Sequence, residues 1–132
     1  MKRIGIIGGG ASGIVAAIAA ARSDGDAQVF ILEQKESIGK KILATGNGRC
    51  NLTNEAMDAS CYHAKIRNLQ ECPGAVRVWG DLEFFASLGL SPKAGAAISI
   101  LAQIRRPPFW NCWEMELRRQ KVKVYTGVRV EA

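Results

Sequence analysis

The stretch Arg3 to Gly13, with the sequence RIGIIGGGASG, and the segment Val29 to Glu33, VFILE, decide the fold of this chain. Residues 3–7 form an apolar run that predicts a strand, and glycines at positions 8, 10 and 13 follow in the order G-x-G-x-x-G. A long alanine-rich stretch then predicts a helix, and the second apolar run ends in an acid 20 residues beyond Gly13. This order of elements is typical of a dinucleotide-binding βαβ unit.

Each glycine of the motif has a separate mechanical role. Gly8 is expected to make the tight turn out of the strand, Gly10 to let the backbone approach a pyrophosphate, and Gly13 to let the helix pack closely on the sheet. The first turn of the helix offers unpaired N–H groups and the positive end of the helix dipole to a diphosphate. No Walker lysine follows the glycines, which argues against a nucleoside-triphosphate P-loop.

The acid Glu33 predicts which dinucleotide binds. A carboxylate at the end of the second strand accepts hydrogen bonds from a ribose hydroxyl, whereas an arginine would accommodate a 2′-phosphate. The residue therefore favours FAD or NAD over NADP at this site.

Two other interpretations remain for the motif: a glycine-rich turn in an unrelated α/β protein, and a signal peptide formed by Met1 to Ala21, which the interspersed glycines disfavour.

Composition sets bounds on the class of protein. A chain of 132 residues with 48% hydrophobic and 23% charged residues is typical of one small globular domain. No later uncharged run is long enough to span a bilayer, so we expect a cytoplasmic protein without membrane contact. The net charge of +6 is consistent with an anionic cofactor and only weakly supports contact with nucleic acid. We expect no metal site, because one histidine and no C-x-x-C pair accompany the four cysteines, Cys50, Cys61, Cys72 and Cys112.

A second informative segment runs from Gly39 to Asn54. It contains the turn Gly46-Asn47-Gly48, and Lys40, Lys41 and Arg49 flank that turn. Such a loop can place amides and a guanidinium beside a pyrophosphate or a flavin. A solvated basic loop between two elements fits the same spacing.

The glycine motif, Glu33 and above all the segment 39–54 are similar to the amino-terminal end of the HI0933-like (BaiN-type) family of NAD(P)/FAD-dependent oxidoreductases. The resemblance implies an incomplete Rossmann-like domain over residues 1–132, with a parallel sheet and the start of a β-meander. It also implies FAD as cofactor and NAD(P)H as electron donor. The implied cofactor-binding residues are Gly8, Gly10, Ala11, Ser12 and Gly13 for the pyrophosphate, Glu33 and Gln34 for the adenosine ribose, and Lys41, Gly46, Gly48, Arg49, Cys50 and Asn51 in the second loop.

Family members are much longer than this chain, which therefore resembles an amino-terminal fragment without the substrate domain and the carboxyl-terminal flavin segment. The family chemistry is hydride transfer between NAD(P)H, flavin and an unsaturated substrate, and we expect the fragment alone to be inactive. The alternative is a non-catalytic nucleotide-binding remnant of a disrupted gene. A small NAD-binding oxidoreductase complete in itself is disfavoured by the segment 39–54. The sequence identifies neither a catalytic group nor a substrate.

Residues 96–113 fit no amphipathic period, and Pro107-Pro108 argues against a continuous helix there. If permitted codons are chosen for these 18 residues and read two bases later, they encode a different peptide. That peptide has a tyrosine-proline turn followed by an amphipathic helix, similar to the family's own segment. We therefore infer a frame excursion in which Trp110 and Trp113 have no core to enter; an ordinary lineage-specific loop is the alternative. The remaining expected elements are helices at 11–22, 76–88 and 114–120 and strands at 28–33, 122–125 and 128–131, with Trp79, Leu82, Phe85 and Leu88 as an apolar stripe.

Overall fold

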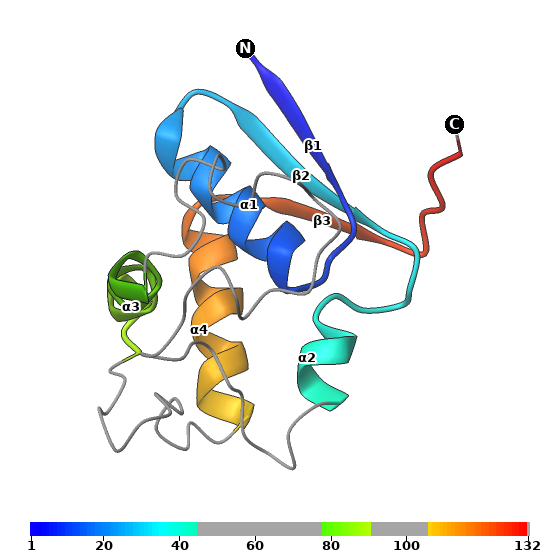
Figure 1. The fold of residues 1–132 in the computed structure, drawn as a ribbon. Coiled ribbons are helices and arrows are strands. Elements are labelled where there is room, and N and C mark those ends of the chain that lie inside the picture. Colours follow the sequence, from blue (N-terminus) through cyan, green and yellow to red (C-terminus); the bar gives the residue numbers. More distant parts are fainter. Residues whose placement is uncertain (45–77, 91–105, 132) are drawn as a thin grey trace, which may run out of the picture. The chain divides into compact units, whose positions relative to one another are not determined.

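The computed structural model describes residues 1–44, 78–90 and 106–131 of the chain (Figure 1). The chain divides into two compact units: residues 1–48 together with 105–132, and residues 49–104. The elements are β1 (Arg3–Ile7), α1 (Ala11–Ser23), β2 (Gln28–Glu33), α2 (Lys40–Ala44), α3 (Val78–Ser87), α4 (Arg106–Arg119) and β3 (Lys123–Thr126). Of the elements in the described ranges, only α3 lies in the second unit.

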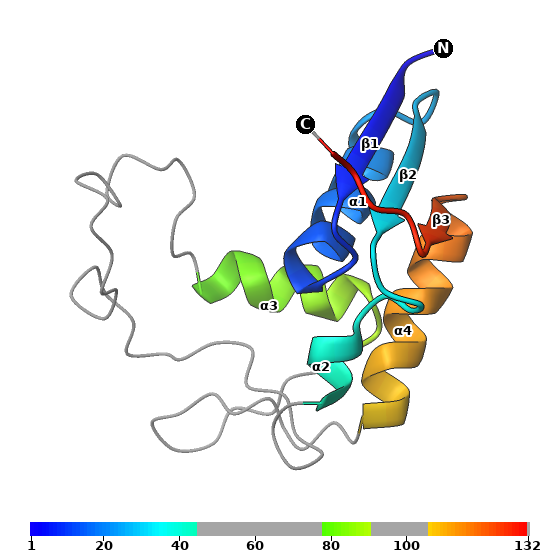
Figure 2. The ribbon, with the colours of Figure 1, turned by 90° about the vertical axis from the view of Figure 1, so that its right-hand side faces the viewer.

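The three strands of the first unit form one parallel sheet in the order β1-β2-β3 (Figures 1 and 2). Ile6 of β1 lies beside Ile31 of β2, which in turn lies beside Val124 of β3. Because β2 lies between β1 and the third strand, the arrangement matches one half of the doubly wound order 3-2-1-4-5-6. The α/β class and the parallel sheet predicted from the glycine motif are confirmed.

Helix α1 covers one face of this sheet. Its residues Ile14, Ala17 and Ile18 are fully buried, and so is Ile31 of β2. The apolar positions of α1 follow helical spacing, whereas Val29 and Ile31 alternate with less buried neighbours, as expected for a strand with one covered face. The small alanine side chains let the helix approach the strands closely. Residues of α1 thus form much of the buried core of the unit, which argues against a signal peptide.

Helix α4 corrects the prediction for residues 106–113. It begins at Arg106 and continues to Arg119, so Pro107-Pro108 occupies its first turn and does not interrupt it. Proline is tolerated there because the first N–H groups of a helix have no intrahelical acceptor. Trp113 is only 2% exposed, so the expectation that it enters no core is wrong. Residues 96–105 of the segment lie outside the described ranges.

A buried carboxylate joins α4 to α1. Glu116 is 6% exposed and accepts hydrogen bonds from Arg22 of α1 at 2.8 Å and from Arg119 at 2.7 Å. Gln120 donates a further bond to it at 2.9 Å. The guanidinium of Arg119 and the other donors lower the pKa of Glu116 from 4.5 to about 2, against the opposing effect of burial. The carboxylate is therefore ionised wherever the protein is folded near neutral pH.

The carboxyl-terminal strands differ from the expectation. β3 pairs in parallel with β2, and no strand is assigned to residues 128–131, so the described residues do not include the start of a β-meander. The chain leaves β3 along the end of β2, because Gly127 N–H donates to the carbonyl of Lys35 at 3.0 Å and Val128 N–H to that of Glu33 at 2.9 Å. On the less buried sheet face, Phe30 and Tyr125 make an edge contact at 6.3 Å between ring centroids.

Helix α3 confirms the helix predicted over residues 76–88. Phe85 and Leu88 of the predicted stripe are buried. The side chains of the other two stripe positions lie outside the description. Among the described helices, none combines the length and the apolar character needed to cross a bilayer.

Candidate nucleotide-binding site

The glycine turn between β1 and α1 has the geometry predicted for it. Gly8 has φ +93°, a conformation that favours glycine, and its N–H donates to the carbonyl of Leu32 at 2.8 Å. A Cβ atom on Gly13 would overlap the carbonyl oxygen of Gly8, so only glycine lets α1 begin this close to the turn. A Cβ atom on Gly10 would meet no atom within 4 Å. Gly10 is therefore free for contact with another molecule.

The amino terminus of α1 is suited to an anion. Gly10 is its N-cap residue and supplies no side-chain cap, and the first turn contains no acidic residue. Gly10, Ala11 and Ser12 are all exposed. Because the first N–H groups of a helix lack intrahelical acceptors and lie at the positive end of its dipole, they can bind phosphate oxygens without a lysine.

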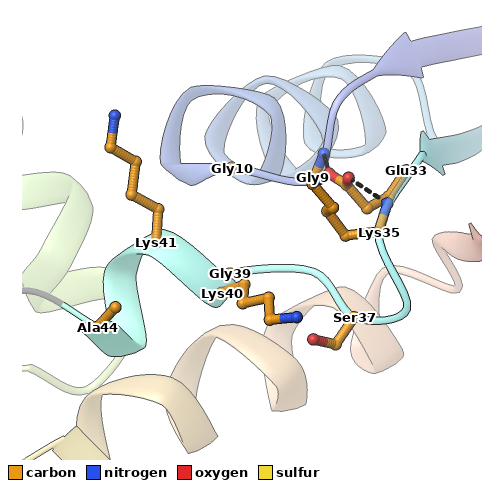
Figure 3. Close-up of a pocket in the computed structure, with 9 residues that line it drawn as sticks. All are labelled: Gly9, Gly10, Glu33, Lys35, Ser37, Gly39, Lys40, Lys41 and Ala44. Atoms are coloured by element: carbon orange, nitrogen blue, oxygen red, sulfur yellow. Dashed lines mark hydrogen bonds between the residues drawn. The ribbon is translucent and has the colours of Figure 1, made fainter.

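Glu33 stands at the carboxyl end of β2, beside the turn (Figure 3). Its Oε1 accepts the N–H of Lys35 at 2.7 Å, and its Oε2 accepts the N–H of Gly9 at 2.6 Å. These two amides, that of Lys35 first, hold the pKa of Glu33 below its ordinary value of 4.5. The residue is therefore an ionised acceptor, and each oxygen keeps a second lone pair for a hydroxyl.

A cavity of about 360 Å³ opens between the glycine turn, the end of β2 and helix α2. Figure 3 shows the residues that line it: Gly9, Gly10, Glu33, Lys35, Ser37, Gly39, Lys40, Lys41 and Ala44. Three lysines and one carboxylate give this cavity a net positive charge. Such a cavity favours an anionic ligand that also carries hydroxyl groups.

The cavity unites three of the predicted site residues, Gly10, Glu33 and Lys41. The predicted residues Gly8, Ala11, Ser12 and Gly13 form the adjoining turn, and Gln34 is exposed beside Glu33 without lining the cavity. The predicted residues Gly46, Gly48, Arg49, Cys50 and Asn51 lie outside the described ranges. Residues 40–44, expected within a loop, form the short helix α2.

Six lining residues were not among the predicted cofactor-binding residues: Gly9, Lys35, Ser37, Gly39, Lys40 and Ala44. Gly9 occupies a variable position of the G-x-G-x-x-G motif, so the motif gives no reason to select it. Lys35 was detectable from its place two residues after Glu33. The other four residues enter the site only because the chain after β2 turns back toward the glycine turn.

Gly39 is the residue at which the chain turns back. It has φ +68°, its N–H donates to the carbonyl of Gly9 at 2.7 Å, and the indole of Trp110 lies directly against its Cα.

We expect Gly39→Ala to destabilise the chain by roughly 2 kcal/mol, because it combines an unfavourable φ with overlap against the Trp110 ring. Gly25→Ala is the matched control, since a Cβ atom there meets nothing within 4 Å and φ is not positive. Urea unfolding monitored by circular dichroism measures both changes, and equal midpoints for the two variants would contradict the expectation.

A parallel βαβ unit with a glycine turn, an uncapped helix amino terminus and an acid at the end of the second strand defines a dinucleotide-binding Rossmann domain. Comparison with known proteins agrees with this class. Residues 2–132 match the HI0933-like protein Rossmann domain, and the chain belongs to this family. It is 68% identical over 137 aligned positions to the 3-dehydro-bile acid delta(4,6)-reductase of Clostridium scindens. The alignment covers 100% of this chain and 32% of that relative, so the chain spans about a third of the relative's length.

Proposed function

We propose that this chain binds FAD and forms the amino-terminal part of a flavoprotein oxidoreductase. The family chemistry proposed for the whole protein is hydride transfer between NAD(P)H, flavin and an unsaturated substrate. The observation that carries the proposal is the exposed, uncapped amino terminus of α1 at Gly10, with the ionised Glu33 lining the same cavity. The relative's name, a reductase, supports the reaction class.

The residues present fit the adenosine-diphosphate part of FAD. Amides at Gly10 to Ser12 would bind the diphosphate, Glu33 would accept a ribose hydroxyl, and Lys41 would add positive charge from α2. When bound, the flavin would supply the hydride chemistry, and the contribution of these residues is to hold and orient it. A 2′-phosphate beside the Glu33 carboxylate would be repelled, which supports FAD over NADP at this position.

Titration calorimetry tests the assignment. We expect FAD and ADP-ribose to bind at least about tenfold more tightly than NADP, equivalent to roughly 1.4 kcal/mol. Lys41→Ala should weaken FAD binding by about threefold through loss of one partly exposed charge contact. Lys123→Ala is the control, because this lysine is exposed at the amino end of β3 and does not line the cavity. Tighter binding of NADP than of FAD would reject the proposal.

The alternative function is a non-catalytic nucleotide-binding remnant of a disrupted gene. The encoding DNA separates the two: a reading frame that continues into the rest of a flavoprotein supports the oxidoreductase, and a disrupted frame supports the remnant. Oxidation of NADH or NADPH by this chain well above the rate with free FAD would reject the remnant, whereas tight FAD binding without oxidation is expected of both, because the chain alone is expected to be inactive. Sequencing of the encoding DNA across residues 96–113 tests the proposed frame excursion directly. We also propose a cytoplasmic location, supported by the packing of α1 against the sheet.

A further inference from the structure

Gly9 is hydrogen-bonded on both sides, to the last residue of β2 and to the loop that follows β2. Its N–H donates to Oε2 of Glu33 at 2.6 Å, and its carbonyl accepts the N–H of Gly39 at 2.7 Å. Gly9 itself is buried, and Figure 3 shows it beside Glu33. Both peptide groups that flank Gly9 are therefore fixed by residues 24 and 30 positions further along the chain.

These bonds set the direction of the amides that face the cavity. The carbonyl of Gly9 and the N–H of Gly10 belong to one planar peptide group and point in opposite directions. The bond from Gly39 therefore orients the N–H of Gly10 as well. A Cβ atom on Gly9 would overlap the side chain of Ile38, so the loop lies directly against the backbone of the turn.

Both oxygens of the Glu33 carboxylate accept backbone N–H groups that fix the glycine turn and the following loop. Oε2 binds the glycine turn through Gly9, and Oε1 binds the start of the following loop through the N–H of Lys35. A group that only accepted a ribose hydroxyl would need neither bond. Both bonds go to amides of the chain itself, so the carboxylate holds the turn against the end of β2.

We propose that Glu33 is a positioning residue for the diphosphate: it fixes the glycine turn to the end of β2, and the Gly39 to Gly9 bond completes the fixation. This inference rests on the proposed function and deepens it, since it assigns to Glu33 a role toward a part of the ligand that it does not contact. Its consequence is that Glu33 matters for ligands that contain no ribose.

The direction in which Glu33→Gln changes the affinity for pyrophosphate distinguishes a positioning role from a role limited to the ribose. A glutamine amide has a single oxygen, so it can accept one of the two N–H groups and must present its NH₂ to the other. A ribose hydroxyl could still donate to that oxygen. Removal of a negative charge beside an anion site would by itself strengthen pyrophosphate binding. A positioning role predicts instead that pyrophosphate binding becomes weaker.

The experiment measures the affinity of the 132-residue chain for FAD and for inorganic pyrophosphate by calorimetry. We expect Glu33→Gln to weaken both by a similar factor, about tenfold, which corresponds to the loss of one charge-assisted bond. Glu36→Gln is the control, because it removes one charge from the same loop at an exposed position that does not line the cavity. Pyrophosphate affinity that is unchanged or higher in Glu33→Gln, with FAD affinity reduced, overturns the inference and leaves the FAD assignment intact.

A second measurement tests the inference without a ligand. Hydrogen exchange of the Gly39 amide reports on the bond to Gly9, which does not involve Glu33 itself. We expect this exchange to accelerate severalfold in Glu33→Gln and to be unchanged in Glu36→Gln. Equal exchange in all three proteins overturns the inference. Absence of FAD and pyrophosphate binding in the unmodified chain rejects the proposed function, and the exchange measurement then still decides the role of Glu33 in the turn.

Discussion

Gly10→Val is expected to abolish FAD binding while the chain stays folded. A Cβ atom at this position meets nothing within 4 Å, and the backbone, with φ −79° and ψ −174°, suits a β-branched residue. The change at the N-cap should cost less than about 1 kcal/mol of stability. The valine methyl groups would occupy the space over the turn through which a diphosphate must reach the amides of α1.

Gly13→Ala is the matched comparison, expected to lower stability where Gly10→Val lowers FAD binding. Its single methyl group would overlap the carbonyl oxygen of Gly8, a backbone atom that cannot move without breaking the turn. We expect a loss of about 3 kcal/mol or more. Urea unfolding and calorimetry on both variants separate the two effects: Gly10→Val should unfold near the midpoint of the unmodified chain without binding FAD. Full FAD affinity in Gly10→Val would contradict the site, and an unchanged midpoint in Gly13→Ala would contradict the close packing.

The second large effect concerns Glu116. Glu116→Ala is expected to destabilise the chain by about 2–3 kcal/mol, because it removes the buried acceptor of Arg22 and Arg119. The arginine side chains are 28% and 66% exposed, so both can turn toward water and the loss stays below that of a fully buried pair. Glu114→Ala removes a carboxylate from the same helix at a partly exposed position and serves as control.

The same carboxylate predicts a pH dependence. The pKa of Glu116 is lowered from 4.5 to about 2 in the folded chain, so the unfolded chain binds more protons between these values. Its contribution is present in full above about pH 5 and decreases as the pH falls toward 2. Unfolding midpoints measured between pH 7 and pH 3 should fall less in Glu116→Ala than in the unmodified chain. Parallel pH profiles for the two proteins would show that the ion network does not act through this ionisation.

The amino-terminal third of the fold was predictable because its signals are local. Strand β1 and strand β2 have the predicted bounds, and α1 extends one residue beyond them. The apolar periods and the glycine motif define these elements without help from the rest of the chain. Helix α4 was not predictable in the same way, because a proline pair is read as a helix breaker unless its place in the first turn is known.

The site residues were likewise predictable only where their signals are local. Gly10 and Glu33 follow from the motif and its spacing, and Lys41 from the resemblance of its segment. Gly9 and Gly39 depend on a contact between positions 30 residues apart, which no short pattern encodes. The parallel pairing of β3 likewise needs the crossover through α4, whereas two short apolar runs joined by Thr126-Gly127 resemble a hairpin.

The link between Arg22 and Glu116 spans 94 positions of the chain, and β3 joins the sheet later still. Contacts of such high sequence separation close slowly, because loop entropy is lost before they form. At a synthesis rate of about 5–20 residues per second, roughly 5–20 seconds pass between the emergence of α1 and that of α4 from the ribosome. During that interval the nascent chain holds a two-stranded βαβ unit whose outer β2 edge and α4-facing helix surface lack their partners. The sheet therefore gains β3 only after α4 has emerged, and we expect the unpaired edge of β2 to be open to chaperones during this delay.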